Sequence, residues 1–374
     1  MTENTSLAVR PTYSKKQIQK AGEFLLNQSA GQDTDEYNQS MEILSYWRSA
    51  HAPALESVTN MLTRECKKHD ASALVAKRLK RTPSIIAKLR RYDEMKLRNM
   101  QDIGGCRAVL KTPKSLQRVY RELNKGGEIK YKNYIKDPKP DGYRGIHIVY
   151  PVKTAETQFR IEIQLRTRSQ HAWATAVEIV DLFTNQNLKS DNGKDEWKDF
   201  FKAASVEIAK LESGTLPSAS DNLETFMTLL RKMKVKEKFE KFSSLVDQID
   251  SPDTSYSGEY SLLSLTKKSK HITIKQFKPH QFFEATTEYL KLEKKTRKSP
   301  SDIVALISVS SLHNLKEAYP NYFADSKHFI DLVLEIERYG DYYYPTGFLY
   351  RMLAIAGFGK VDSIKALNGP LTPQ

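Results

Sequence analysis

The chain is poor in cysteine, in acidic residues and in long apolar runs, and each shortage excludes a class of protein. Its two cysteines, Cys66 and Cys106, are too few for a disulfide framework or a cysteine zinc site. No run approaches 18 apolar residues, so we expect no membrane span. Residues 1–6 lack the charged and apolar segments of a signal peptide. A reducing, cytoplasmic setting is therefore expected.

Lysine and arginine outnumber aspartate and glutamate by 59 to 45, which gives a net charge of +14. This excess favours polyanionic partners, either nucleic acid or the phosphates of a nucleotide. A basic surface can also serve solubility alone, so the charge does not choose between these interpretations.

The order of the expected elements indicates an α+β protein with a mixed β-sheet flanked by helices. In the first 255 residues, periodicity predicts helices at 14–28, 36–68 with a break at Pro53, 84–98, 113–124, 168–183, 195–212 and 221–249. Strands are predicted at 106–111, 129–134, 146–153 and 158–165.

Residues 251–258 have the composition of a linker, so we expect two domains, 1–255 and 256–374. The second is predicted to be a smaller α+β module. Its expected strands are 259–265, 271–277 and 302–309, and its expected helices are 279–296, 311–318, 325–338 and 346–356.

A dense run of cations occupies residues 77–98, opposed only by Asp93 and Glu94. Arg78 and Lys80 alternate on an extended approach to a helix, Ser84 is placed to cap that helix, and Lys88 follows one turn later. Free N–H groups at a helix start attract anions, whereas cations there oppose the helix dipole. We favour phosphate binding over the alternative, a solvated helix face.

Two carboxylates, Asp102 and Glu162, are candidate metal ligands. Glu162 begins an alternating stretch that, as a strand, points Glu162, Gln164 and Arg166 to one face. Asp102 precedes a pair of glycines. Mg²⁺ prefers one or two carboxylates plus substrate oxygens as ligands. The pair therefore predicts a site that binds a nucleotide together with its metal ion. The alternative for Asp102 is a turn residue.

A loop containing glycine, from Lys139 to His147, presents cations and one aromatic ring. Tyr143 could stack on a nucleobase, while Lys139, Arg144 and His147 meet its phosphates or sugar. The alternative is an ordinary hairpin turn with a buried tyrosine.

In the same order, these segments resemble the synthetase domain of the RelA/SpoT family of alarmone synthetases, over about residues 40–250. Lys77-Arg78-Leu79-Lys80, with Ser84 and Lys88, resembles the ATP-phosphate motif of that family. Lys139-Pro140-Asp141-Gly142-Tyr143-Arg144 resembles its acceptor loop. The resemblance implies transfer of the β,γ-pyrophosphate of ATP to a ribose 3′-hydroxyl.

The resemblance also implies roles for single residues. Arg107 would pack on the adenine, and Asp102 and Glu162 would hold the metal. Glu162 would also activate the acceptor hydroxyl, with His147, Gln164 and Arg166 orienting the acceptor. The sequence departs from the family at Gly145-Ile146-His147, where Ser-Leu-His is usual. Long members of the family also carry a hydrolase domain with a His-Asp…Glu-Asp signature. Here no acidic pair follows His69-Asp70, so we expect no hydrolase activity.

Within the family, the chain resembles the fused toxic synthetases of the CapRel toxin–antitoxin type used in phage defence. That resemblance implies that the C-terminal module inhibits the enzyme through a Tyr-x-x-Tyr motif covering the ATP site, matched here by Tyr339 and Tyr342. The alternative is that these tyrosines pack the module on itself. The resemblance further implies the 3′ end of tRNA as acceptor and a phage protein as a partner sensed by the module.

The sequence leaves three functions open. The first is Mg²⁺-dependent pyrophosphate transfer from ATP to tRNA. The second keeps this chemistry but uses GDP, GTP or an adenine nucleotide as acceptor. The third is an inactive module that binds RNA or senses a partner.

Overall fold

The computed structural model describes residues 13–27, 34–92, 94–125, 129–153, 158–184, 195–249, 260–265, 273–296, 303–308 and 322–344. Its backbone packs into two compact units. The first unit comprises Met1–Asn133 and Ile146–Arg166, and the second comprises Tyr134–Gly145 and Thr167–Gln374. The functional division expected at residue 255 remains a prediction.

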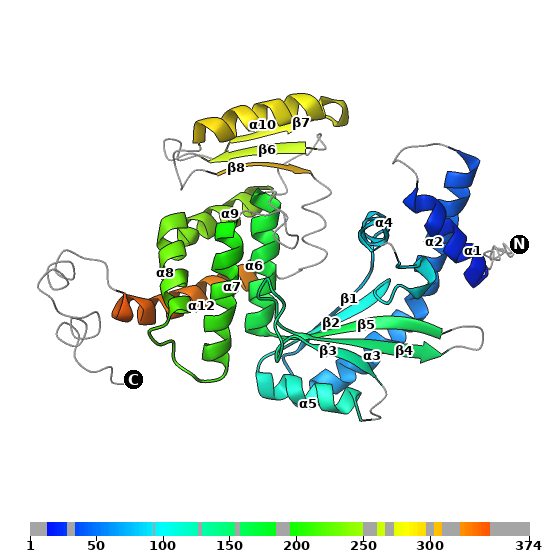
Figure 1. Ribbon diagram of the computed structural model, residues 1–374, viewed down its shortest axis with the longest axis horizontal. Helices are drawn as coiled ribbons and strands as arrows, with labels where there is room; N and C mark the ends of the chain where they lie inside the picture. Colours follow the sequence, from blue (N-terminus) through cyan, green and yellow to red (C-terminus); the bar gives the residue numbers. More distant parts are fainter. Residues whose placement is uncertain are drawn as a thin grey trace, which may run out of the picture. The chain divides into compact units, whose positions relative to one another are not determined.

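A five-stranded sheet in the order β1-β2-β5-β4-β3 forms the centre of the first unit. The strands are β1 (Leu74–Leu79), β2 (Gly104–Leu110), β3 (Lys130–Asn133), β4 (Ile146–Lys153) and β5 (Gln158–Thr167). Helices α3 (Ala52–His69) and α5 (Pro113–Leu123) pack on the sheet at β2 (Figure 1). The mixed sheet flanked by helices confirms the predicted fold class.

The alternation of side chains along β5 explains why one face of the sheet is apolar and the other polar. Phe159, Ile161 and Ile163 are buried on one face. Glu162 and Gln164 lie on the opposite face and keep partial exposure. The polar face of β5 is therefore the place at which the first unit can meet a ligand.

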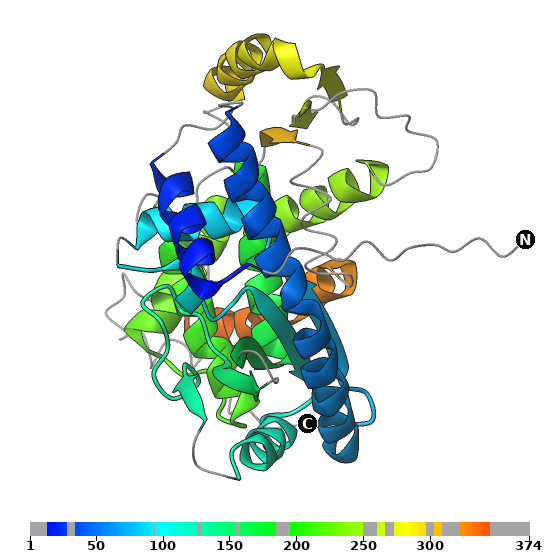
Figure 2. The same cartoon turned by 90° about the vertical axis from the view of Figure 1, so that its right-hand side faces the viewer.

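Four further elements complete the first unit: α1 (Lys15–Leu26), α2 (Asp35–Ala50), α4 (Thr82–Arg91) and the 3₁₀ turn η1 (Leu97–Asn99). In the rotated view, α2 and α3 are the blue helices that follow each other along the chain (Figure 2). Helix α1 packs on α2, α4 and η1. At Gly22 the approach to Leu97 is so close that a Cβ would lie 2.6 Å from the Leu97 Cβ.

The second unit contains a helical layer made of α6 (Arg168–Thr184), α7 (Asp195–Glu212), α8 (Asp221–Met233), α9 (Val235–Ile249) and α12 (Tyr322–Tyr343). Its core is rich in phenylalanine, and Phe200, Phe226 and Phe329 are completely buried. Because α12 contributes Phe329 to this core, a helix from the expected C-terminal module helps to hold α6 to α9 together.

A three-stranded sheet, in the order β7-β6-β8, also belongs to the second unit. Its strands are β6 (Tyr260–Leu265), β7 (Thr273–Phe277) and β8 (Ile303–Ser308), and both neighbours of β6 are antiparallel to it. The turn η2 (Pro279–Gln281) leads into α10 (Phe282–Thr296), which packs on β6 and β8. These elements match the strands and the helix predicted there.

Two predictions about the helix at 84–98 were wrong. The helix predicted at 84–98 is α4, which ends at Arg91, where three cations in the last turn suit the negative end of the helix dipole. Its N-cap is Arg81 instead of Ser84, because Pro83 fits the first turn of a helix that begins at Thr82. The break predicted at Pro53 in the helix 36–68 is confirmed within two residues, since α2 ends at Ala50 and α3 begins at Ala52 with Pro53 in its first turn.

The helix predicted at 221–249 is two helices, since Lys234 adopts a left-handed conformation with φ of 50°. Met233 and Val235 are both buried, and in one continuous helix two residues this far apart would point to opposite sides. The helices expected at 311–318 and 346–356 and the linker at 251–258 lie outside the described residues. No helix in the described part of the chain is long and apolar enough to cross a membrane.

Candidate active site

Asp102 lies between two lysines in the first unit. Its Oδ2 accepts hydrogen bonds from Lys80 Nζ at 2.9 Å and from Lys88 Nζ at 2.8 Å. Only 14% of the Asp102 side chain is exposed. Its other oxygen, Oδ1, is buried and has no hydrogen-bond partner among the described residues. A buried carboxylate oxygen of this kind has spare capacity to bind a cation or a donor.

The backbone at Lys80 is held from both sides. Its N–H donates to the Ile103 carbonyl at 2.7 Å, and its own carbonyl accepts from Arg48 Nε of α2 at 2.9 Å. These contacts fix the chain where it leaves β1, so that Lys80 can reach Asp102. Sequence reasoning missed Arg48, because nothing in its local pattern distinguishes it from other helix-surface arginines.

Glu162 on β5 is surrounded by hydrogen-bond donors. Its Oε1 lies 3.1 Å from His147 Nδ1 on β4, and its Oε2 accepts from Gln164 Nε2 at 2.8 Å. Arg166 Nη2 in turn donates to Gln164 Oε1 at 3.1 Å. The strand register explains the set, since His147 stands opposite Gln164 across the β4–β5 pair.

Glu162 is held as a carboxylate by its surroundings. Burial alone would raise its pKa, but His147, Gln164 and the charge of Lys88 outweigh that effect and lower the pKa to about 2. The same Lys88 ammonium donates a hydrogen bond to Asp102. One cation therefore acts on both carboxylates, as expected if their side chains converge.

The two carboxylates fit a hard divalent cation. Carboxylate oxygens are preferred ligands of Mg²⁺, which also keeps waters and substrate phosphates in its coordination shell. In the part of the chain that the structure describes, no group of three or more His, Cys, Asp or Glu is arranged around a metal position. A cation held by Asp102 and Glu162 would therefore need oxygens from a bound substrate.

The remaining ATP-phosphate candidates lie on the elements that surround Asp102. Arg78 stands on β1 opposite Gly105 of β2, where the absence of a side chain leaves room beside it. Arg107 stands opposite Ala76 on the same pair of strands and is half-buried. Ser84 is exposed in the first turn of α4, and its backbone N–H is one of those that the helix leaves without a partner.

The expected acceptor loop, Lys139–His147, begins in the second unit, whose segment Tyr134–Gly145 contains Lys139, Tyr143 and Arg144, while His147 lies in the first unit. The Asp141 carboxylate accepts from the Tyr143 N–H at 2.9 Å, and Gly142 has a φ of +92°. A Cβ on Gly142 would lie 3.1 Å from both Lys202 Cα and Ser205 Cβ of α7. The tight turn therefore depends on glycine at this position.

Tyr143 and Arg144 are tied to the helical layer. Tyr143 is 9% exposed and makes an edge contact with Trp173. Lys139 Nζ lies 4.8 Å from the centre of the Tyr143 ring. Arg144 donates to Ser205 Oγ and to the Ile135 carbonyl, both at 3.1 Å. Base stacking by Tyr143 stays a prediction, and it requires Lys139 to leave its place at the ring.

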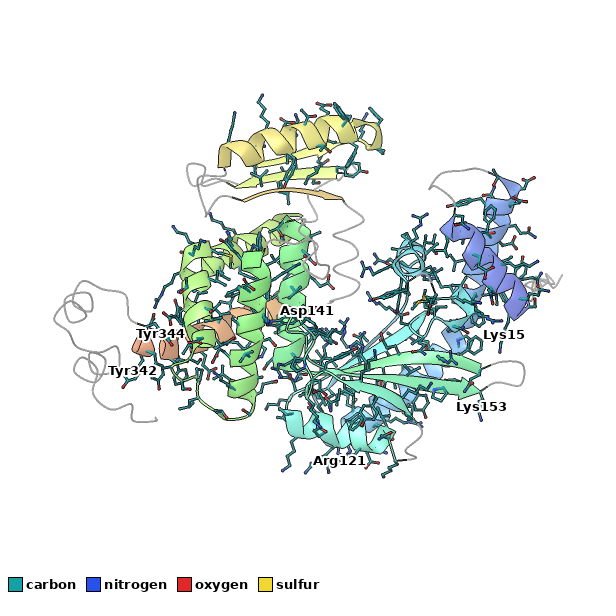
Figure 3. The ribbon with its side chains drawn as sticks, viewed as in Figure 1. Lys15, Arg121, Asp141, Lys153, Tyr342 and Tyr344 are labelled. Atoms are coloured by element: carbon teal, nitrogen blue, oxygen red, sulfur yellow. The ribbon has the colours of Figure 1, made fainter. Side chains whose placement is uncertain are left out.

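Tyr339 and Tyr342 lie near the end of α12, and Figure 3 labels Tyr342 there. The rings of Tyr342 and Tyr343 form an edge contact at 5.0 Å. The next residue, Tyr344, anchors the end of the helix, because its hydroxyl donates to the Ser220 carbonyl at 3.0 Å and accepts from the Ser220 N–H at 3.0 Å. The regulatory role of the Tyr-x-x-Tyr motif stays a prediction.

Part of the chain is similar to known proteins. Residues 77–180 match the family described as "Region found in RelA / SpoT proteins". GTP pyrophosphokinase YwaC of Bacillus subtilis (strain 168) is 32% identical over 111 residues, which cover 26% of this chain and 52% of YwaC. The uncharacterized protein Rv1366 of Mycobacterium tuberculosis is 29% identical over 155 residues, which cover 40% of this chain and 54% of Rv1366.

Among solved structures, the small alarmone synthetase 1 of Bacillus subtilis, bound to its product pppGpp, is 24% identical. The match covers 46% of this chain and 94% of that chain, with a TM-score of 0.39. The chain spans about half the length of the curated relatives it matches. Asp102 and Glu162 both lie inside the segment matched by the family. The chain therefore carries, in residues 77–180, the region found in RelA / SpoT proteins.

Proposed function

We propose that the protein is a Mg²⁺-dependent pyrophosphokinase that transfers pyrophosphate from ATP to the 3′-hydroxyl at the CCA end of tRNA. The observation that carries this proposal is the position of Lys88, which donates to Asp102 and whose charge lowers the pKa of Glu162. Two carboxylates that are both influenced by one lysine suit a metal-bound triphosphate. The similarity of this chain to a relative named GTP pyrophosphokinase supports the reaction class.

The reaction requires positioning and charge neutralisation more than covalent chemistry. Arg78, Lys80 and Lys88 hold the triphosphate. The 3′-oxygen of the acceptor attacks the β-phosphorus, and the bond from that phosphorus to the α,β-bridging oxygen breaks, so that AMP leaves. When bound, Mg²⁺ supplies neutralisation of the charge that develops on the phosphate oxygens.

The proton of the attacking hydroxyl passes to Glu162. A carboxylate with a pKa of about 2 binds a proton weakly, since an effective base has a pKa nearer the working pH. His147 Nδ1 donates to Glu162 Oε1 across 3.1 Å and therefore already carries a proton, so the transferred proton leaves Glu162 for solvent. Glu162 is thereby restored as an anion for the next turnover.

The most specific part of the proposal is the identity of the molecule that accepts the pyrophosphate. The net charge of +14 favours a partner with many phosphates, such as tRNA, because each neutralised phosphate releases counterions. A free guanosine or adenine nucleotide is the second candidate, favoured by the name of the relative from Bacillus subtilis. Pyrophosphate on the terminal adenosine of tRNA would block aminoacylation and make the enzyme a toxin.

An acceptor assay distinguishes the two candidates. The full chain is incubated with Mg²⁺ and γ-labelled ATP, in which the label lies in the transferred pyrophosphate. One reaction contains tRNA and the other contains GDP, GTP and ATP. We expect label on tRNA that is lost when the terminal ribose is oxidised. Label only on a small nucleotide would reject tRNA and support the second candidate.

The metal site is tested in the same assay by Asp102→Asn and Glu162→Gln. Removing a charge that stabilises the transition state should lower the rate on the order of 10²–10³-fold. Glu56→Gln is the matched control, since Glu56 is an exposed carboxylate on α3 that pairs with Lys77. Variants that fold normally and transfer label at the wild-type rate would reject the proposed centre.

We further propose that Tyr339 and Tyr342 restrain the enzyme, as a fused antitoxin of a phage-defence protein would. The double variant Tyr339→Ala/Tyr342→Ala should be faster in the acceptor assay and more toxic in cells. Tyr343→Ala is the matched control from the same helix end. Equal rates for the double variant and wild type, with unchanged thermal unfolding, would reject autoinhibition by these tyrosines.

A further inference from the structure

A cavity of about 180 Å³ lies in the first unit, lined by Lys15, Trp47, His51, Arg98, Asn99, Met100, Gln158 and Arg160. None of Lys80, Lys88, Asp102 and Glu162 lines it, so it is distinct from the candidate metal centre. Of the residues that line it, only Arg98, in the basic run 77–98, was singled out from the sequence.

Three of the lining side chains are cations, and no acidic residue is among them. Lys15 begins α1, Arg98 lies in η1, and Arg160 lies on β5. Across the residues that the structure describes, none of the three forms an ion pair or a side-chain hydrogen bond. All three side chains are exposed, so water screens their mutual repulsion. Together they place positive charge from distant parts of the sequence around one cavity, where an anion would be attracted.

One lining residue, Trp47, carries a buried donor. Trp47 is 6% exposed, and its indole Nε1 has no hydrogen-bond partner among the described residues. Indole nitrogen can only donate, so this buried group requires an acceptor, and leaving it unsatisfied is costly. The ring is fixed by an edge contact with His51 at 4.7 Å, and His51 Nδ1 lies 2.7 Å from the Trp47 carbonyl.

Charge and donors together define the ligand. Three cations, the indole N–H and the side-chain amides of Asn99 and Gln158 offer donors to an anion with several oxygens. A phosphate group has this character, and arginine binds it through two parallel hydrogen bonds. We propose that this cavity is a second phosphate-binding site, which takes a phosphomonoester or phosphodiester group.

The test follows the Trp47 indole N–H by ¹H–¹⁵N NMR on the full chain, which has three tryptophans, with Trp47→Phe assigning the signal. Titration with inorganic phosphate should shift that signal saturably. Arg98→Ala/Arg160→Ala should weaken binding tenfold or more, on the order expected for losing two charged donors. The matched control is Arg118→Ala/Arg121→Ala on α5, which removes the same charge away from the cavity (Figure 3 labels Lys15 and Arg121).

A signal that does not shift, or that shifts equally in Arg98→Ala/Arg160→Ala, would overturn the proposal. Loss of the shift in Lys80→Ala/Lys88→Ala would also overturn it, because the phosphate would then belong to the candidate metal centre. The proposal does not need catalysis, so a negative acceptor assay leaves it standing.

The source of the phosphate group is settled by two further titrations. One uses AMP, which offers a phosphomonoester, and the other uses a short RNA that ends in CCA and has no terminal phosphate, which offers only phosphodiesters. A shift at lower concentration with RNA assigns the cavity to an acceptor backbone. A shift at lower concentration with AMP assigns it to a free nucleotide. No shift with either ligand would reject the assignment to an organic phosphate.

Discussion

At the scale of single residues, Glu162 shows which contacts a sequence pattern can predict and which it cannot. Alternation predicted that Glu162, Gln164 and Arg166 share a face, and the structure joins them in a chain of hydrogen bonds. The pattern could not predict that His147 would bond to the same carboxylate, because that contact depends on the register of β4 against β5. Register is fixed by tertiary packing.

The lowered pKa of Glu162 makes folding stability depend on pH. Its pKa falls from 4.5 to about 2 in the folded chain, which corresponds to about 3 kcal/mol. Because the folded-state value is the lower one, this contribution is complete above about pH 5 and is lost as the pH falls toward 2. Wild type should exceed Glu162→Gln in unfolding free energy near pH 7, and the difference should shrink through that window.

Chemical denaturation of both proteins at several pH values measures the difference. The comparison cancels the contributions of all other carboxylates, because they are the same in both chains. A difference that stays constant from pH 7 to pH 3 would show that Glu162 is not held as an anion by its neighbours.

Gly142 offers a second prediction, on the turn of the expected acceptor loop. Gly142→Ala must hold an L-residue at a φ of +92° and place a Cβ 3.1 Å from two atoms of α7. The backbone conformation costs about 1–2 kcal/mol, and the crowding about 1–3 kcal/mol more. Gly214→Ala is the control, since Gly214 has a φ of +74° with open space around it.

Denaturation midpoints of the two alanine variants separate backbone strain from crowding. We expect both to lie below wild type, with Gly142→Ala clearly the lower. Equal midpoints would mean that the loop does not press on α7 as described.

At the scale of elements, long periodic segments were predicted well and their ends less well. Helices 113–124, 168–183 and 195–212 match α5, α6 and α7 within a residue or two. The break at Lys234 escaped prediction, because lysine carries no signal for a left-handed conformation. The true start of α4 was also missed, although the proline at its second position was a usable sign.

The candidate site was predictable as a list of residues but not as a geometry. Charge and alternation selected Lys80, Lys88, Asp102 and Glu162 from the sequence. They could not reveal that both lysines bond to a single oxygen of Asp102. Charge and alternation could not identify Arg48 or the full lining of the cavity at Trp47 either. Those residues come together only after α1, α2 and β5 have packed.

Helix α12 was expected in a separate module, yet its apolar face completes the core around α7 and α9. The Phe329 ring lies 5.8 Å from Phe201 and 5.3 Å from Phe239. Phe329→Ala should therefore destabilise the second unit by about 3–5 kcal/mol. Leu334→Ala, on the same helix at 41% exposure, should cost no more than about 0.5 kcal/mol. Thermal unfolding of the two variants would refute this role of α12 if their midpoints coincide.

At the scale of the whole molecule, the packing of α12 changes how a truncation must be interpreted. Deleting residues 256–374 removes the buried Phe329, Val333 and Ile336 and uncovers the apolar surfaces that they cover. We expect the truncated chain to bind hydrophobic dyes and to unfold without a sharp transition. If such a fragment were more toxic, the loss of autoinhibition could not be distinguished from an effect of misfolding. The substitutions of Tyr339 and Tyr342 are therefore the sharper test of autoinhibition.

Near-UV circular dichroism of the truncated chain, compared with the full chain, measures the loss of fixed packing. A fragment that stays monomeric and keeps a sharp thermal transition would contradict this prediction. It would also show that residues 1–255 fold alone, as the domain boundary in the sequence suggested.

The path of the chain between the two units limits how relatives can be recombined. The backbone passes from one unit to the other at 133/134, at 145/146 and at 166/167, so neither unit is a continuous stretch of sequence. A chimaera joined near residue 255 exchanges only α12 among the described helices of the helical layer. The exchanged α12 must then pack against the phenylalanines of the host chain. Such hybrids should inherit activity only when the donor and the host share the interior surface on which α12 rests.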